Sequence, residues 1–195
     1  MKRANTNHPA KGSRITVDPI RSLKDIGRIK RALSGRDLLL FTIGINNGLR
    51  IGDILKLKVG DVIDLEPGET VPIKEQKTGK VNVLMVNKEV HKALHKYLAE
   101  AELNDSDYLF KSRKGGNSPL SVSYCSQLVK RWCVGLKGNF GSHSLRKTFG
   151  FIQRTQFGVD FSLLCKRFGH SSPAITMRYL GINDAEVNSI LLHEI

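Results

Sequence analysis

The chain of 195 residues is predicted to be mainly α-helical with a small antiparallel β-sheet, which is an α+β fold. Over most of its length apolar residues recur with the period of an α-helix, the pattern of amphipathic helices. One region, residues 70–86, is instead strand-like on both sides of a turn. The length is that of one domain with a sizeable core. We therefore expect helices around one core, with a hairpin between them.

The first 20 residues are expected to be a flexible basic arm, and residues 21–195 the folded domain. The arm lacks apolar periodicity, and its cations suit contacts with phosphate groups. An unstructured tail without such a role explains the same pattern equally well. The cations of the arm are Lys2, Arg3, Lys11 and Arg14.

Three helices are expected before the hairpin. Ser22 can cap the first, which runs to about residue 33. The second, residues 36–46, is strongly apolar and hence buried, and Gly48 helps to end it. The third starts near Arg50 and continues to about residue 57.

The hairpin is predicted from strands at 70–73 and 81–86 with a turn at 77–80, and Pro72 places the first strand at an edge. A helix capped by Asn87 follows and runs to about residue 101. It carries two histidines one turn apart, but no third ligand is evident, so a solvated pair is favoured over a zinc site.

The C-terminal half is predicted to hold four helices, near residues 121–133, 144–157, 160–168 and 173–180. A tail from Asp184 is amphipathic, and it can pack on its own domain or dock on a neighbouring protomer. Several further cations, most of them in loops and turns, are candidate DNA contacts, although for the loop at 111–119 a solvated loop is at least as good an explanation. They are Lys80, Lys111, Arg113, Lys114 and Lys147.

The charge of the chain points to a polyanionic partner. Thirty-one Lys and Arg against 18 Asp and Glu give a formal net charge of +13, which favours nucleic acid. Ribosomal proteins, proteins that bind anionic membranes and basic enzymes share this property. The three cysteines lack metal-ligand spacing and are expected to be small buried side chains in a reducing cytoplasm. No apolar run is long enough to span a bilayer, and no secretory signal is present.

Residues able to act on a phosphate group gather near the C-terminus. His143 and Arg146 lie three positions apart, and His170 and Tyr179 follow within 33 residues of Arg146. An arginine binds phosphate oxygens through its planar fork of donors, a histidine donates or transfers a proton, and a tyrosine can attack as a nucleophile. Earlier in the chain, Lys77 lies at the hairpin turn.

Arg50 follows the glycine turn at Gly48, and Asp53 lies three residues further on. A carboxylate at that spacing on a helix can hold a guanidinium in place.

These segments together resemble the catalytic domain of the tyrosine recombinases, also called the phage integrase family. The matching stretches are residues 48–61, the lysine of Gln76-Lys-Thr-Gly79, His143-Ser-Leu-Arg146, and Gly169-His170 followed by Tyr179. Each motif alone is weak, but five in the family's order on so basic a chain are specific. The resemblance covers roughly residues 20–190 and implies the fold of the DNA breaking-rejoining enzymes.

The resemblance implies cleavage and rejoining of DNA through a 3′-phosphotyrosine, with neither metal nor other cofactor. Tyr179 would be the nucleophile, Arg50 and Arg146 would bind the nonbridging oxygens, and Lys77 would protonate the leaving 5′-oxygen. His143 would accept a proton or donate to the phosphate. The two remaining residues would have supporting roles: His170 a hydrogen bond to the phosphate, Asp53 the orientation of Arg50 and of His143.

The resemblance also implies partners and a setting. The partners are double-stranded DNA, further copies of the chain in a homotetramer on DNA joined through the C-terminal segment, and accessory DNA-bending proteins. The setting is the cytoplasm, with the gene belonging to a bacterium, a phage or a mobile element. Most members carry an N-terminal DNA-clamping domain that this sequence lacks, so a minimal enzyme, which Met1 favours, or a fragment is expected. A relaxing enzyme of the type IB topoisomerase kind and a non-catalytic DNA-binding regulator are alternative functions.

Overall fold

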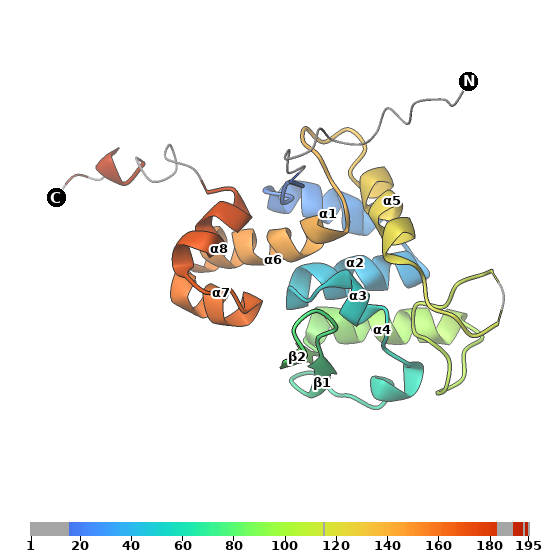
Figure 1. Cartoon of the computed structure of the whole chain (residues 1–195). Coiled ribbons are helices and arrows are strands. Elements are labelled where there is room, and N and C mark those ends of the chain that lie inside the picture. Colours follow the sequence, from blue (N-terminus) through green and yellow to red (C-terminus); the bar gives the residue numbers. More distant parts are fainter. Residues whose placement is uncertain (1–15, 115, 183–188, 193, 195) are drawn as a thin grey trace, which may run out of the picture.

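The computed structural model describes residues 16–114, 116–182, 189–192 and 194. Helices dominate it, as predicted, and its described strands form one two-stranded antiparallel sheet. Helix α2 is central: it packs against α4 on one side and α6 on the other (Figure 1). Within the described residues no helix is long and apolar enough to cross a membrane. The helices and the small antiparallel sheet confirm the predicted α+β fold.

The first helices follow their predicted caps closely. Helix α1 (Leu23–Ala32) begins where the Ser22 hydroxyl accepts a hydrogen bond from the Asp25 amide. Helix α2 (Gly35–Asn47) ends at Gly48, whose φ of 59° is the left-handed conformation that favours glycine.

The third helix, α3 (Ile51–Ile54), is shorter than predicted and stops well before residue 57. The chain leaves it to pair Lys58 with Tyr108 in an isolated bridge, and a 3-10 turn, Val59–Asp61, follows. A contact with a residue 50 positions away sets this helix end, and local pattern cannot reveal it.

Strands β1 (Thr70–Lys74) and β2 (Val81–Met85) form the hairpin, with Pro72 opposite Val83. The Asn47 side chain fastens β2 to the end of α2, since its amide donates to the Met85 carbonyl and its oxygen accepts from the Met85 amide. The hairpin is thereby held beside the start of α3, below α2 in Figure 1.

The remaining helices are α4 (Lys88–Glu100), α5 (Val122–Trp132), α6 (Ser142–Phe157), α7 (Phe161–Phe168) and α8 (Pro173–Leu180), with a 3-10 turn at Ser189–Leu192. The predicted caps Asn87 and Ser121 accept from Val90 and Tyr124. Helix α6 starts two residues earlier than predicted. Helices α7 and α8 pack together at one end of α6 (Figure 1).

The core has two parts. The larger joins α1 to α6 and the hairpin, while a small cluster of Leu164, Phe168 and Leu180 joins α7 and α8. Gly150 of α6 permits this second packing, because a Cβ there would lie 2.6 Å from the Phe168 ring. The three cysteines are free and buried, as predicted.

The last described residues of the predicted N-terminal arm contact the folded domain. Ile20 is buried, and its amide donates to the Thr148 hydroxyl of α6 at 2.8 Å. The Asp18 amide donates to the Asn139 carbonyl. An apolar side chain two residues before the helix cap is enough to dock the segment. The four cations of the arm lie outside the described residues, as does most of the predicted C-terminal docking tail.

Candidate active site

Residues from four separate elements converge at one place. Arg50 is the N-cap of α3, His143 and Arg146 lie in the first turns of α6, His170 joins α7 to α8, and Tyr179 lies near the end of α8. Their electrostatic interactions confirm the convergence, since Arg146 and Arg50 both act on the two histidines and on Tyr179.

Arg146 is the buried centre of this group, with 3% of its surface exposed. Its Nη1 donates to the Gly48 carbonyl at 2.6 Å and its Nη2 to the Phe168 carbonyl at 2.9 Å. A guanidinium has five N–H donors, so three are not bound by these carbonyls, and the Tyr179 hydroxyl lies close to this side of the guanidinium. The Phe168 ring packs 4.8 Å from the guanidinium carbon. Burial lowers the pKa of Arg146, and the bound carbonyls and ring fix its orientation.

The Tyr179 hydroxyl is buried beside Arg146 without a well-aligned hydrogen bond. The Tyr179 ring packs edge-on against Phe168 and His170, with centroids 5.5 and 5.1 Å apart. Burial raises the pKa of Tyr179, and the attraction of Arg146 and Arg50 offsets only a part of that rise. The tyrosine is therefore docked in the site, neutral, and short of one polar partner.

Lys147 lies under the same ring and not at the surface. Only 7% of it is exposed, and its ammonium lies 5.0 Å from the Tyr179 ring centroid. Burial lowers its pKa. Lys147, a predicted DNA contact, is therefore buried beside the tyrosine.

His170 is oriented by its neighbours. Its Nδ1 lies 2.9 Å from the Thr176 hydroxyl of α8, which leaves Nε2 without a partner among the described residues. Its amide donates to the Cys165 carbonyl. Burial and then the charges of Arg146 and Arg50 lower its pKa.

His143 faces solvent at the rim of the site. The protein packed around its ring and the cations Arg146, Arg50, Lys147 and Lys77, in that order, lower its pKa. A histidine that is neutral near pH 7 can accept a proton. The four cations together make the electrostatic potential of the site strongly positive.

Arg50 is paired with a carboxylate that the sequence did not reveal. Its Nη1 lies 2.7 Å from Oε2 of Glu75, a residue 5% exposed directly after β1. The predicted pair with Asp53 does not form. Arg50 is the N-cap, with extended dihedral angles of −70° and 139°, so the three-residue helical spacing does not apply to it.

Asp53 supports the hairpin instead. It is 3% exposed, its Oδ1 accepts from the Gln76 amide at 2.9 Å, and its Oδ2 has no hydrogen-bond partner. Gln76 directly precedes Lys77, so the carboxylate that was expected to orient Arg50 anchors the start of the lysine loop.

Lys77 lies in the exposed turn between the strands. The Gly79 amide donates to the Glu75 carbonyl and the Glu75 amide to the Lys80 carbonyl, which closes the turn. Gly79 has a φ of 69°, a conformation that favours glycine. Because the Lys77 charge contributes to the lowered pKa of His143, the turn faces the same site.

The other predicted DNA-contact cations divide by their surroundings. Lys80, Arg113 and Lys114 are exposed. Lys111 instead lies 2.7 Å from the Asp107 carboxylate, so it is engaged in a local ion pair. Among the described residues, no group of histidine, cysteine and carboxylate side chains could hold a metal ion.

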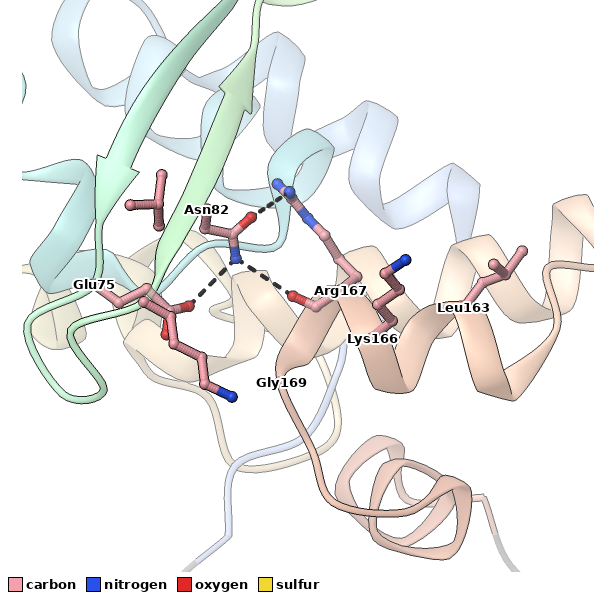
Figure 2. Close-up of a pocket in the computed structure, with 8 residues that line it drawn as sticks. Glu75, Asn82, Leu163, Lys166, Arg167 and Gly169 are labelled. Carbon is pink, nitrogen blue, oxygen red and sulfur yellow. Dashed lines mark hydrogen bonds between the residues drawn. The ribbon is translucent and has the colours of Figure 1, made fainter.

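Arg167 is a second residue that the sequence did not reveal. From α7 it donates to the Asn47 carbonyl at 2.6 Å, the Asn82 side-chain oxygen at 2.6 Å and the Val83 carbonyl at 2.9 Å. It therefore fastens α7 both to the end of α2 and to the hairpin. Figure 2 shows Asn82 between Arg167 and Glu75.

Known proteins resemble this chain in sequence. The sequence profile of the phage integrase family matches residues 13–186. A probable integrase/recombinase, YoeC of Bacillus subtilis strain 168, is 37% identical over 175 residues, which cover 86% of this chain and 91% of YoeC. The tyrosine recombinase XerC of Caldanaerobacter subterraneus is 27% identical over 85% of this chain but only 47% of its own length.

Solved structures share the fold. The XerH site-specific recombinase, in a post-cleavage complex with its palindromic difH substrate, superposes with a TM-score of 0.73 at 25% identity, over 93% of this chain and 53% of XerH. The XerA recombinase gives 0.71 at 24% identity, over 90% of this chain and 65% of XerA. The chain therefore belongs to the phage integrase family, and it is a tyrosine-type site-specific recombinase.

Proposed function

We propose that this chain breaks and rejoins DNA by transesterification at Tyr179. The observation that supports this most is the Tyr179 hydroxyl, which is buried against the Arg146 guanidinium without a well-aligned hydrogen bond, while that guanidinium uses only two of its five N–H donors on protein carbonyls. A phosphate group placed there would supply the missing acceptors. The DNA-bound state of the XerH relative supports DNA as the substrate.

In the proposed reaction the Tyr179 oxygen attacks the scissile phosphorus, and the bond to the 5′-oxygen breaks. Arg146 and Arg50 bind the nonbridging oxygens, where negative charge grows in the transition state. Such preorganised donors are typically worth about 3–4 kcal/mol each. The product is a 3′-phosphotyrosine ester, which conserves the bond energy, so rejoining by the free 5′-hydroxyl needs no ATP.

Two proton transfers complete the step. Tyrosine has an ordinary pKa of about 10, and burial raises that of Tyr179 further, so its proton must be removed as it attacks. Neutral His143 is the proposed acceptor, while His170 donates to the phosphate. Lys77 protonates the leaving 5′-oxygen. These cations provide charge stabilisation directly, and the proposal therefore requires no metal ion.

A trap for the covalent intermediate tests the proposal. Duplexes of randomised sequence, nicked a few bases from their centre, release a short fragment after cleavage and so block rejoining. Protein-linked DNA that survives denaturant is recovered and sequenced, and mass spectrometry locates the linked residue. We expect an adduct on Tyr179 in the wild type and none in Tyr179→Phe. Adduct at another residue, or binding without adduct, would contradict the proposal, and the latter would favour a regulator.

The duplex recovered in this way also tests the acid and the assembly. Lys77→Ala should slow cleavage sharply, and a 5′-bridging sulfur, which leaves without protonation, should restore most of the rate. Equal slowing on both duplexes would remove Lys77 from the acid role. We propose exchange between two sites within a tetramer; relaxation of supercoiled plasmid by a monomer, without exchange, would favour a relaxing enzyme.

A further inference from the structure

Glu75 touches two parts of the proposed site at once. Its Oε2 lies 2.7 Å from Nη1 of Arg50 and also accepts from the Thr78 hydroxyl at 2.6 Å. Its Oε1 accepts from the Asn82 amide at 3.3 Å. Both oxygens are thus engaged, and 5% of the residue is exposed. A surface ion pair would engage neither so fully.

The contacts of Glu75 fix the lysine loop from both sides. Its main chain bonds to Gly79 and Lys80, which closes the turn, while its side chain holds Thr78, the neighbour of Lys77. Any displacement of this carboxylate would therefore move the loop. Because the same oxygen pairs with Arg50, it would move the guanidinium too.

Asn82 extends the contact to the C-terminal helices. Its oxygen accepts from Arg167 Nη1 at 2.6 Å and its amide lies 3.4 Å from the Arg167 carbonyl (Figure 2). Arg167 directly precedes Phe168, whose carbonyl orients Arg146. A pocket of about 380 Å³ opens between the hairpin and α7 at this point. Glu75 thus lies between the arginine of α3, the lysine loop and α7.

The carboxylate is kept ionised in this place. Burial alone would raise the pKa of Glu75, but its contacts with Thr78, Arg50 and Asn82 outweigh burial and lower it. A glutamine at this position would set an amide donor against the donors that now converge on the carboxylate. Charge and acceptor geometry are both needed.

We propose that Glu75 is a positioning residue that holds Arg50 and the Lys77 loop in one register, so that both reach the same phosphate. This inference rests on the function proposed above. It assigns Glu75 no contact with the DNA. It predicts that the defect of a Glu75 variant is partly a defect of the general acid, which a merely structural ion pair would not produce.

The test compares leaving groups on the duplex selected by the wild type. Glu75→Gln should slow adduct formation by on the order of 100-fold on the oxygen duplex, the effect of a misplacement of about 1 Å. The 5′-bridging sulfur should restore a part of that loss, more than for Arg50→Ala and less than for Lys77→Ala. Thr78→Val, which loosens only the loop, should be restored almost fully. The matched control is Glu100→Gln, an exposed carboxylate at the end of α4, with an unchanged rate.

Two results would overturn the inference: an unchanged rate in Glu75→Gln, or equal slowing on both duplexes. A DNA-free measurement separates its failure from that of the proposed function. Nitrogen NMR of the Arg50 guanidinium should show restricted rotation in the wild type and free rotation in Glu75→Gln, with faster amide exchange at Gly79. Unchanged signals would overturn the positioning role even if the wild type formed no adduct.

Discussion

Removing the Tyr179 hydroxyl should stabilise the free protein while abolishing its chemistry. The hydroxyl oxygen is buried and lacks a well-aligned partner. An unsatisfied buried polar group costs about 1–3 kcal/mol. The nearby Arg146 recovers some of that cost, so we expect Tyr179→Phe to raise the free energy of unfolding by about 1 kcal/mol. For a chain of this size the melting temperature should rise by about 2–4 °C.

Denaturant unfolding of matched variants measures this gain. Tyr124 provides the control, because it is exposed and its hydroxyl only accepts a long bond of 3.5 Å from Arg131. Tyr124→Phe should therefore change the free energy of unfolding by less than about 0.5 kcal/mol. Tyr179→Phe should form no covalent adduct, so stability and activity should move in opposite directions.

The advantage of Tyr179→Phe should also depend on pH. Because the pKa of Tyr179 is raised in the folded state, the unfolded chain ionises first as pH rises through about 10. The wild type then loses stability that the phenylalanine variant retains, so the difference should widen above about pH 10. A Tyr179→Phe variant less stable than the wild type, or a difference independent of pH, would refute a docked hydroxyl that lacks a well-aligned hydrogen bond.

Three further predictions concern packing and charge. Gly150→Ala would bring a Cβ within 3 Å of side chains of α7 and α8, so calorimetry should show a free energy of unfolding lower by about 1–3 kcal/mol. Gly27→Ala in α1, where there is room for a Cβ, should be neutral or stabilising. The Lys147 cation at the face of the Tyr179 ring favours the phenolate form of Tyr179. Lys147→Met removes this cation, so the pH profile of adduct formation should shift to higher pH. NMR of the His143 ring should show that its lowered pKa increases when sulfate is added, because the anion offsets the surrounding cations. The same lowered pKa predicts that the free energy of unfolding falls as pH drops below about 6.5, where the unfolded chain takes up the proton first.

The helices could be predicted because their signals are local. Ser22 and Asn87 satisfy amides three residues ahead, and Gly48 adopts the left-handed conformation that its place required. The length of α3 could not be predicted, because its end depends on the bridge between Lys58 and Tyr108. The docking of Ile20 depends in the same way on Thr148, 128 residues away.

The residues of the candidate site likewise divide into those with a local sequence signal and those whose contacts arise only from the fold. His143, Arg146, His170 and Tyr179 were predicted through their order in the chain, and the fold brings them together. Glu75 and Arg167 were missed because each resembles an ordinary surface residue until its partners are known. The partners of Arg167 lie 84 to 120 residues away. Residues that position others leave no local motif, since what they contact is created by the fold.

The two-part core has a consequence for how the site could be regulated. Tyr179 and His170 belong to the α7–α8 unit, whose small cluster contains only Leu164, Phe168 and Leu180 among its buried members. Parts of a protein with few buried apolar contacts open locally at lower free energy than its main core. Opening of this unit would withdraw Tyr179, the proposed nucleophile, while the larger core keeps Arg50 in place. The hydrogen bonds of Arg146 and Arg167 across the boundary oppose that opening, so these two arginines tie assembly of the site to the folding of its last helices.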